Sequence, residues 1–87
     1  MTCLNRIVLD VLKPRSPNAL EFASAVADTN EGCEITVVVT EVDEKTETTL
    51  VTVTGENIKY EQLVETISRF GGSIHSIDEV TVSNIAP

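Results

Sequence analysis

The residues with the clearest chemical potential gather near the C-terminus, in the segment 71–80. This segment contains the only histidine of the chain, His75, together with two serines and the adjacent carboxylates Asp78 and Glu79. An imidazole can bind a metal, transfer a proton near neutral pH or hold a structural hydrogen bond. Carboxylate oxygens are ligands that calcium and magnesium prefer. The segment is therefore the candidate functional site of this sequence.

One further carboxylate, Asp10, joins this candidate site if the last strand of the chain lies beside the first. An antiparallel register then brings Asp78 or Ser76 close to Asp10. The candidate ligands of a divalent cation, calcium or magnesium, are then Asp10, Asp78, Glu79 and His75. The alternative is that Asp78 and Glu79 are solvated charges that protect an edge strand, with His75 in a structural role. Both interpretations stay open here.

Zinc binding and enzymatic catalysis find less support in the residue types. Zinc sites combine three or four His or Cys ligands, whereas this chain has one histidine and two distant cysteines, Cys3 and Cys33. Nucleophilic catalysis needs a base within hydrogen-bond reach of the nucleophile, and no oxyanion site is marked by the sequence. We therefore expect a non-enzymatic protein, with an enzyme that uses His75 and Asp78 as the minor alternative.

The pattern of apolar residues predicts four strands and two helices. The strands are expected at residues 5–12, 34–42, 48–54 and 74–82, and the helices at 17–27 and 60–70. Ser16 is expected to cap the first helix, with Pro17 at its first position. Gly71 and Gly72 end the second helix.

The resulting order is β-α-β-β-α-β, which predicts a ferredoxin-like α+β sandwich. Such a fold has a four-stranded antiparallel sheet with both helices on one face, and here it forms a single domain over residues 1–87, with 83–87 as a loose tail. The first and second strands are then separated by the third, so their starts lie ~9.5 Å apart. This distance argues against a disulfide between Cys3 and Cys33.

The sheet face without helices is expected to be half apolar. It carries Val8, Leu12, Val38, Val42 and Leu50 among several threonines. A contiguous patch of this kind often marks a protein contact, and a domain this small has a modest core that a partner copy would supplement. Scattered exposed valines are the simpler explanation, but we favour the contact with another protomer.

The last strand has an irregular apolar spacing. Ile74, Ile77 and Val80 are three residues apart, whereas side chains on a strand alternate every two. The spacing predicts a β-bulge, which re-aims the side chains around it. The sequence therefore does not define which way His75, Asp78 or Glu79 faces.

The charge balance limits the class of partner. The chain has 14 acidic and 6 basic residues, a formal net charge of −8. Affinity for nucleic acid and for anionic membrane surfaces comes from Lys and Arg, so both partners are disfavoured. No apolar run approaches the ~18 residues of a membrane helix, and no basic segment of a signal peptide begins the chain. We expect a cytoplasmic protein.

Three motifs in order resemble one known family. They are Arg6–Pro14 (RIVLDVLKP), Ile35–Val37 (ITV) and Gly71–Val80 (GGSIHSIDEV). The chain is similar over essentially its whole length to the small archaeal proteins grouped as domain of unknown function 211. The resemblance implies a ferredoxin-like fold, ring-like homo-oligomers and a cytoplasmic archaeal source, but no activity, substrate or catalytic residue.

Two details accompany this resemblance. The second helix of such proteins often begins with an acidic cap, whereas Lys59 stands there in this chain, and a lysine cannot accept hydrogen bonds from the first-turn amides. Other small ferredoxin-like domains are regulatory modules. By analogy of fold alone, the alternative function is a module that holds an unidentified small ligand between protomers.

Overall fold

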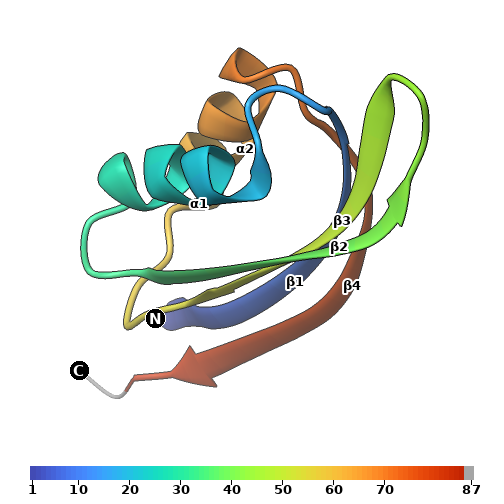
Figure 1. Cartoon of the computed structure of the whole chain (residues 1–87). Helices are drawn as coiled ribbons and strands as arrows, with labels where there is room; N and C mark the ends of the chain where they lie inside the picture. Colours follow the sequence, from blue (N-terminus) through green and yellow to red (C-terminus); the bar gives the residue numbers. More distant parts are fainter. Residues whose placement is uncertain (86–87) are drawn as a thin grey trace.

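The structure, a computed structural model that describes residues 1–85, has six elements in the predicted order. They are β1 (Thr2–Pro14), α1 (Ala19–Asp28), β2 (Glu34–Val42), β3 (Thr46–Thr54), α2 (Tyr60–Arg69) and β4 (Ser73–Asn84). The strands form one sheet in the order β2-β3-β1-β4, with antiparallel neighbours throughout. Both helices lie on the concave side of the curved sheet (Figure 1). The ferredoxin-like α+β fold is thereby confirmed.

The core lies between the helices and the sheet and is almost entirely aliphatic. Alternate residues of β1 and β3 point into it, because side chains on a strand alternate between the two faces. They pack against Phe22 and Val26 of α1 and against Leu63 and Ile67 of α2. Full burial of one such side chain contributes ~1.5–3 kcal/mol. This layer holds β1, and with it Asp10, in a fixed position.

The first helix begins two residues later than the sequence suggested. Its N-cap is Asn18, whose Oδ1 accepts a hydrogen bond from the Glu21 amide at 2.8 Å. The Glu21 carboxylate accepts one in return from the Asn18 amide at 3.1 Å. This reciprocal pair satisfies two amides that the helix leaves unbonded. The expectation that Ser16 caps the helix was wrong, because the carboxylate needed three residues after the cap belongs to Glu21.

The second helix is bounded as its sequence indicated. Lys59 occupies the N-cap position and its side chain makes no capping bond. After the helix, Gly71 adopts a φ of 82°, a left-handed conformation that glycine reaches at little cost. The Gly72 amide then donates to the Ile67 carbonyl at 2.9 Å. The glycine pair thus turns the chain directly from α2 into β4.

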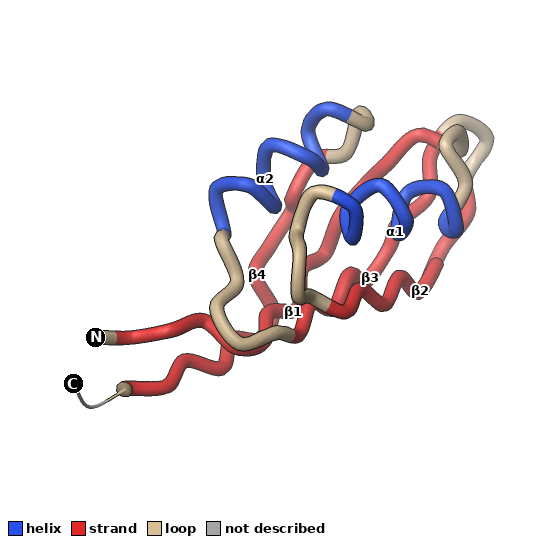
Figure 2. Tube along the Cα trace, turned by 90° about the vertical axis from the view of Figure 1, so that its left-hand side faces the viewer, coloured by secondary structure: helices blue, strands red, loops and turns tan. Residues whose placement is uncertain are grey.

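The N- and C-terminal strands extend beyond the rest of the sheet. Thr54, the last residue of β3, pairs with Arg6, so Thr2, Cys3 and Leu4 have strand partners in β4 alone. The two strand ends project together past the helices (Figure 2), and the molecule measures 50 × 23 × 17 Å. Ser83 and Asn84 therefore belong to β4 rather than to the predicted tail, and the Ile85 amide donates to the Met1 carbonyl. Residues 86–87 lie outside the described part.

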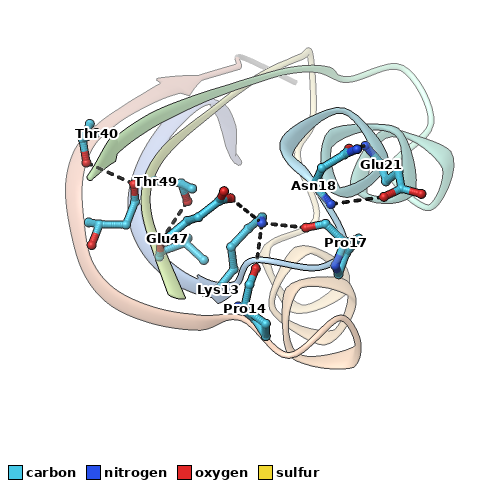
Figure 3. A network of polar contacts seen from close by, with 10 residues as sticks. Lys13, Pro14, Pro17, Asn18, Glu21, Thr40, Glu47 and Thr49 are labelled. Atoms are coloured by element: carbon cyan, nitrogen blue, oxygen red, sulfur yellow. Dashed lines mark hydrogen bonds and ion pairs between the residues drawn. The ribbon is translucent and has the colours of Figure 1, made fainter. Parts of the chain in front are cut away.

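The helix-facing side of β1 ends in a buried cation, Lys13. Its Nζ donates to the carbonyls of Pro14 and Pro17, at 2.8 and 2.6 Å, and to the Glu47 carboxylate at 2.7 Å (Figure 3). It also lies 5.8 Å from the centre of the Phe22 ring. All three ammonium protons thus have an acceptor. The network fixes the loop that joins β1 to α1.

Candidate functional site

The pairing of β4 with β1 contains two irregularities within the candidate site. Ile74 lies across from Val11 of β1. Ser76 lies across from Asp10, the residue that precedes Val11 in β1. His75 is therefore an extra residue between the two pairs. The structure thus confirms a bulge in this strand, and Asp10 has Ser76 as its cross-strand neighbour, one of the two residues expected there.

A second bulge follows at once. Ile77 lies across from Leu9, and Glu79 lies across from the preceding residue, Val8. Asp78 is therefore the extra residue of this bulge. Two insertions within five residues explain why a simple alternation fails along this strand, since each one resets which side chain faces which side of the sheet.

The two bulges sort the side chains of β4 by polarity. Ile74, Ile77 and Val80 lie across from β1 residues that face the helices, and directly opposite residues share a face. Ser76 and Glu79 lie across from residues of the open face. We call the set His75, Ser76, Asp78 and Glu79 the polar row.

Both extra residues reach the open face as well. His75 lines a shallow groove of about 300 Å³ together with Asp10, Leu12 and Thr48. Asp78 accepts a hydrogen bond from the Ser76 hydroxyl at 2.6 Å. The groove therefore combines a carboxylate, an imidazole, a hydroxyl and an apolar wall, which suits hydrogen bonding to a small polar ligand.

The four residues predicted as metal ligands share this face but have different partners. Asp10 and His75 line the groove, whereas Asp78 is bonded to Ser76. The Glu79 carboxylate accepts a hydrogen bond from the Arg6 guanidinium at 2.5 Å. Within residues 1–85, no three His, Cys, Asp or Glu side chains are grouped so that they could hold a metal ion. One protomer therefore supplies at most part of such a site.

Glu79 is held near Arg6 by an ion pair that faces solvent. About half of each side chain is exposed, so the pair contributes less than ~1 kcal/mol. Its main effect is local: it offsets one carboxylate of the polar row, while Asp10 and Asp78 have no arginine or lysine in an ion pair within the described residues.

The two cysteines stand apart from the candidate site. Cys3 is buried and Cys33 is half-buried, and both are free thiols. Burial raises the pKa of the Cys33 thiol, because the thiolate loses hydration there. A raised pKa makes the thiol a weaker nucleophile at neutral pH, which is a property of a structural cysteine.

The opposite side of β4 carries a feature that the sequence reasoning missed. Ile77, Val80 and Val82, the apolar row, face the helix side but are 50%, 54% and 55% exposed. Each helix has only ten residues, and neither covers this part of the strand. The three-residue spacing of apolar residues in the sequence indicated a bulge. It did not indicate that the helices would leave the resulting apolar row exposed.

The expected apolar patch on the open face is present in part. Leu12 and Val38 are exposed there, whereas Val8 is buried and Leu50 is half-buried. The expectation that Val42 belongs to this face was wrong, because the irregularity at Thr40 places Val42 across from Glu47, which binds Lys13 on the helix side. Large apolar side chains are thus exposed on both faces of one thin sheet.

Fold and site together define a small ferredoxin-like α+β protein with a polar row on its open face and an uncovered apolar edge. The chain belongs to the DUF211 family, described as uncharacterized ArCR, whose model matches residues 5–85. It is 39% identical over 80 residues to the uncharacterized protein MJ0319 of Methanocaldococcus jannaschii, a match that covers 92% of this chain and 82% of the relative. No helix among residues 1–85 is long and apolar enough to cross a membrane.

Proposed function

We propose that this protein is a non-enzymatic cytoplasmic module that works as a homo-oligomer. The observation that supports it is the exposure of large apolar side chains on both faces of the sheet, including the apolar row. Monomeric proteins rarely leave contiguous apolar patches in water. With only 87 residues, the chain also buries a smaller fraction of its surface than a larger domain does. Association would remove this apolar surface from water.

The test is the mass of the unmodified chain in solution. Size-exclusion chromatography with light scattering, over a dilution series in the micromolar range, is expected to give one oligomer of constant mass. A monomer throughout the series would contradict the proposal. A ring-like assembly, which the resemblance to the family implies, would give a single closed species rather than a distribution of oligomer lengths.

Within this function, the polar row and Asp10 are proposed to bind a divalent cation, calcium or magnesium. Asp10, His75, Asp78 and Glu79 all reach the open face at one edge of the sheet. A protomer of net charge −8 is repelled by its copies, and a cation between carboxylates would relieve part of this repulsion. Since one chain provides an incomplete ligand set, the remaining oxygens would come from a second protomer or from water.

Titration calorimetry with calcium and with magnesium tests the cation site. Asp10→Asn is expected to weaken binding strongly, since it removes a ligand charge without changing the size of the side chain. Glu44→Gln, at the exposed hairpin tip, removes the same charge elsewhere and is expected to leave binding unchanged. Equal effects of the two variants would show that only the net charge matters, and no heat of binding would contradict the site.

The second candidate function is a regulatory module that binds a small polar ligand. The groove of Asp10, Leu12, Thr48 and His75 supports it, because it combines hydrogen-bonding groups with one apolar wall. A ligand that binds the folded state raises the melting temperature by mass action. A thermal-shift screen of small metabolites in chelator-containing buffer would separate this function from cation binding, since a hit there does not depend on divalent metal.

A further inference from the structure

We propose that the free edge of β4 pairs with the free edge of β2 in a second copy of this chain, head to tail and antiparallel. The inference rests on the proposed self-association and names its contact surface. The sheet order β2-β3-β1-β4 leaves the outer sides of β2 and β4 without a strand partner among the described residues. Unpaired strand edges are templates for pairing with another chain.

The strand directions fit such a continuation. β4 and β3 both run antiparallel to β1, and β2 runs antiparallel to β3, so β4 and β2 are antiparallel to each other. A second copy placed in the same orientation beside β4 therefore offers its β2 as an antiparallel neighbour. Every adjacent pair in the extended sheet is then antiparallel, and the helices of both copies lie on one side.

The free edge of β4 has a regular stretch of sufficient length. Both of its bulges lie at or before Asp78, and residues 79–84 contain no further insertion in this strand. The Ile85 amide donates to the Met1 carbonyl, on the side of β1, and backbone groups alternate in direction along a strand. The amides and carbonyls of Val80 and Val82 therefore point outward. β2 offers a matching stretch at 34–39, before its own irregularity at Thr40.

The side chains on the helix side of the two edges are complementary. Ile35, Val37 and Val39 of β2 face the helices and are only half-buried. Directly opposite residues share a face, so the pairing places Val80 and Val82 beside two of these three side chains. Apolar residues that are exposed or half-exposed in one chain then cover each other.

A helix of the second copy comes with its β2 strand. α1 packs on β2, so pairing at β2 brings α1 of the partner to the side of the sheet on which the apolar row lies uncovered. Leu20 of α1 is 75% exposed, although it is a large apolar residue. Leu20, Ala23 and Ala27 share one flank of the helix through their i, i+3, i+7 spacing. This flank provides the partner with a smooth apolar cover.

Charge favours this pairing over contact between two β4 strands. Two β4 edges paired around Asp78 and Glu79 would oppose these carboxylates with their own copies, and like charges across a strand pair are destabilising. The open-face residues at the centre of β2, Thr36 and Val38, are uncharged. Contact between two β2 edges would leave the apolar row exposed. The head-to-tail arrangement covers the apolar row, brings α1 of the partner over it and keeps the carboxylates of the polar row away from their own copies.

Cysteine cross-linking tests the pairing and its register, in a chain whose two native cysteines are replaced by serine. Alternation of the two faces allows Thr81 to lie opposite Glu34, Thr36 or Val38. Only Thr36 and Val38 also place both Val80 and Val82 opposite residues of the stretch 34–39. Thr81 does not direct its amide to the free edge, so it forms a closely spaced non-hydrogen-bonded pair within disulfide reach. Within one chain, Thr81 and Thr36 lie on opposite sheet edges, three strand spacings or ~14 Å apart, too far to bond.

The expected result is a ladder of disulfide-linked species for one of the double variants, Thr81→Cys/Thr36→Cys or Thr81→Cys/Val38→Cys. Thr81→Cys/Val37→Cys, whose second residue faces the other side, serves as the control and should not link. Links in Thr81→Cys alone would show β4–β4 contact and overturn the proposal. So would an oligomer of unchanged mass in which neither double variant links. A cysteine-free chain that is monomeric at micromolar concentration contradicts the proposed function itself.

Discussion

Lys13 is buried, although no pattern in the sequence indicates it. A lysine beside a proline at the end of a strand suggests solvent, yet its side chain is fully buried. An unpaired ammonium in the interior would cost several kcal/mol. Three acceptors, including the Glu47 carboxylate, compensate for this cost. The acceptors come from the loop and from β3, so no local sequence pattern announces them.

Replacing Lys13 by methionine is expected to destabilise the fold by about 3 kcal/mol, because removal of one partner leaves the other as a largely buried unpaired charge. Urea unfolding followed by circular dichroism measures the loss. Arg69→Met is the matched control, since Arg69 pairs with Glu65 on an exposed helix face, where such a pair is worth ~0.3–0.5 kcal/mol. Equal losses in the two variants would contradict the structural role of Lys13.

Cys33 gives a prediction with a defined pH dependence. Burial raises the pKa of its thiol in the folded state, so the unfolded chain loses this proton at lower pH. The contribution of this group to stability is therefore present below the ordinary thiol pKa and decreases as the pH rises through the raised value. In a Cys3→Ser chain, the rate at which Cys33 is alkylated should begin to rise at a higher pH in the folded protein than in the denatured protein. Coincident profiles would refute the shift.

At this scale the sequence identified the candidate residues but not their arrangement. His75, Asp78 and Glu79 stood out by type, and the spacing of Ile74 and Ile77 indicated a bulge. The side of the sheet that the three polar residues face depends on where the insertions fall relative to β1. This is a property of strand pairing and not of local sequence. Whether these residues bind a cation remains a prediction of the sequence that the proposed calorimetry addresses.

At the scale of elements, the two helices differ in how they begin. α1 has a reciprocal cap made by Asn18 and Glu21, whereas α2 begins at Lys59 without any side-chain cap. Both positions have an extended backbone, which an N-cap requires. The difference makes the two helix starts natural controls for each other.

Lys59→Asp is expected to stabilise the protein by ~0.5–1 kcal/mol, because the new carboxylate accepts first-turn amides and interacts favourably with the helix dipole. Asn18→Ala is expected to destabilise it by ~1 kcal/mol. Thermal unfolding should show melting temperatures that move in opposite directions. If both variants melted lower than the unmodified chain, the cap assignment of α2 would be wrong.

The element order could be predicted because apolar periodicity changes clearly between strand and helix segments, as in residues 34–42 and 60–70. The ends were less accurate for identifiable reasons. The N-cap of α1 depends on Glu21 reaching back to Asn18, and the extra length of β4 depends on β1 lying beside it. Ser83 and Asn84 are ordered by pairing with Cys3 and Thr2, at the opposite end of the chain.

At the scale of the whole molecule, the proposed assembly depends on the free edge of β4, which pairs with β2 of a second copy. Val80→Lys places a charge in the apolar row, a device by which natural edge strands avoid pairing. Since Val80 is about half-exposed already, the fold should tolerate the change while the oligomer dissociates. Light scattering measures the mass, and circular dichroism checks the fold. Gln62→Lys adds the same charge on the exposed side of α2, away from β4, and should keep the unmodified mass.

The most direct measurement is a native mass spectrum of the unmodified chain, purified without chelators. The account predicts a single oligomer mass, with an excess of a few tens of daltons per subunit where a calcium or magnesium ion is bound. Loss of this excess on chelation would assign it to the cation. A bare monomer at micromolar concentration would contradict the central claim, since the apolar row and the open face would then remain in water without a second copy to cover them.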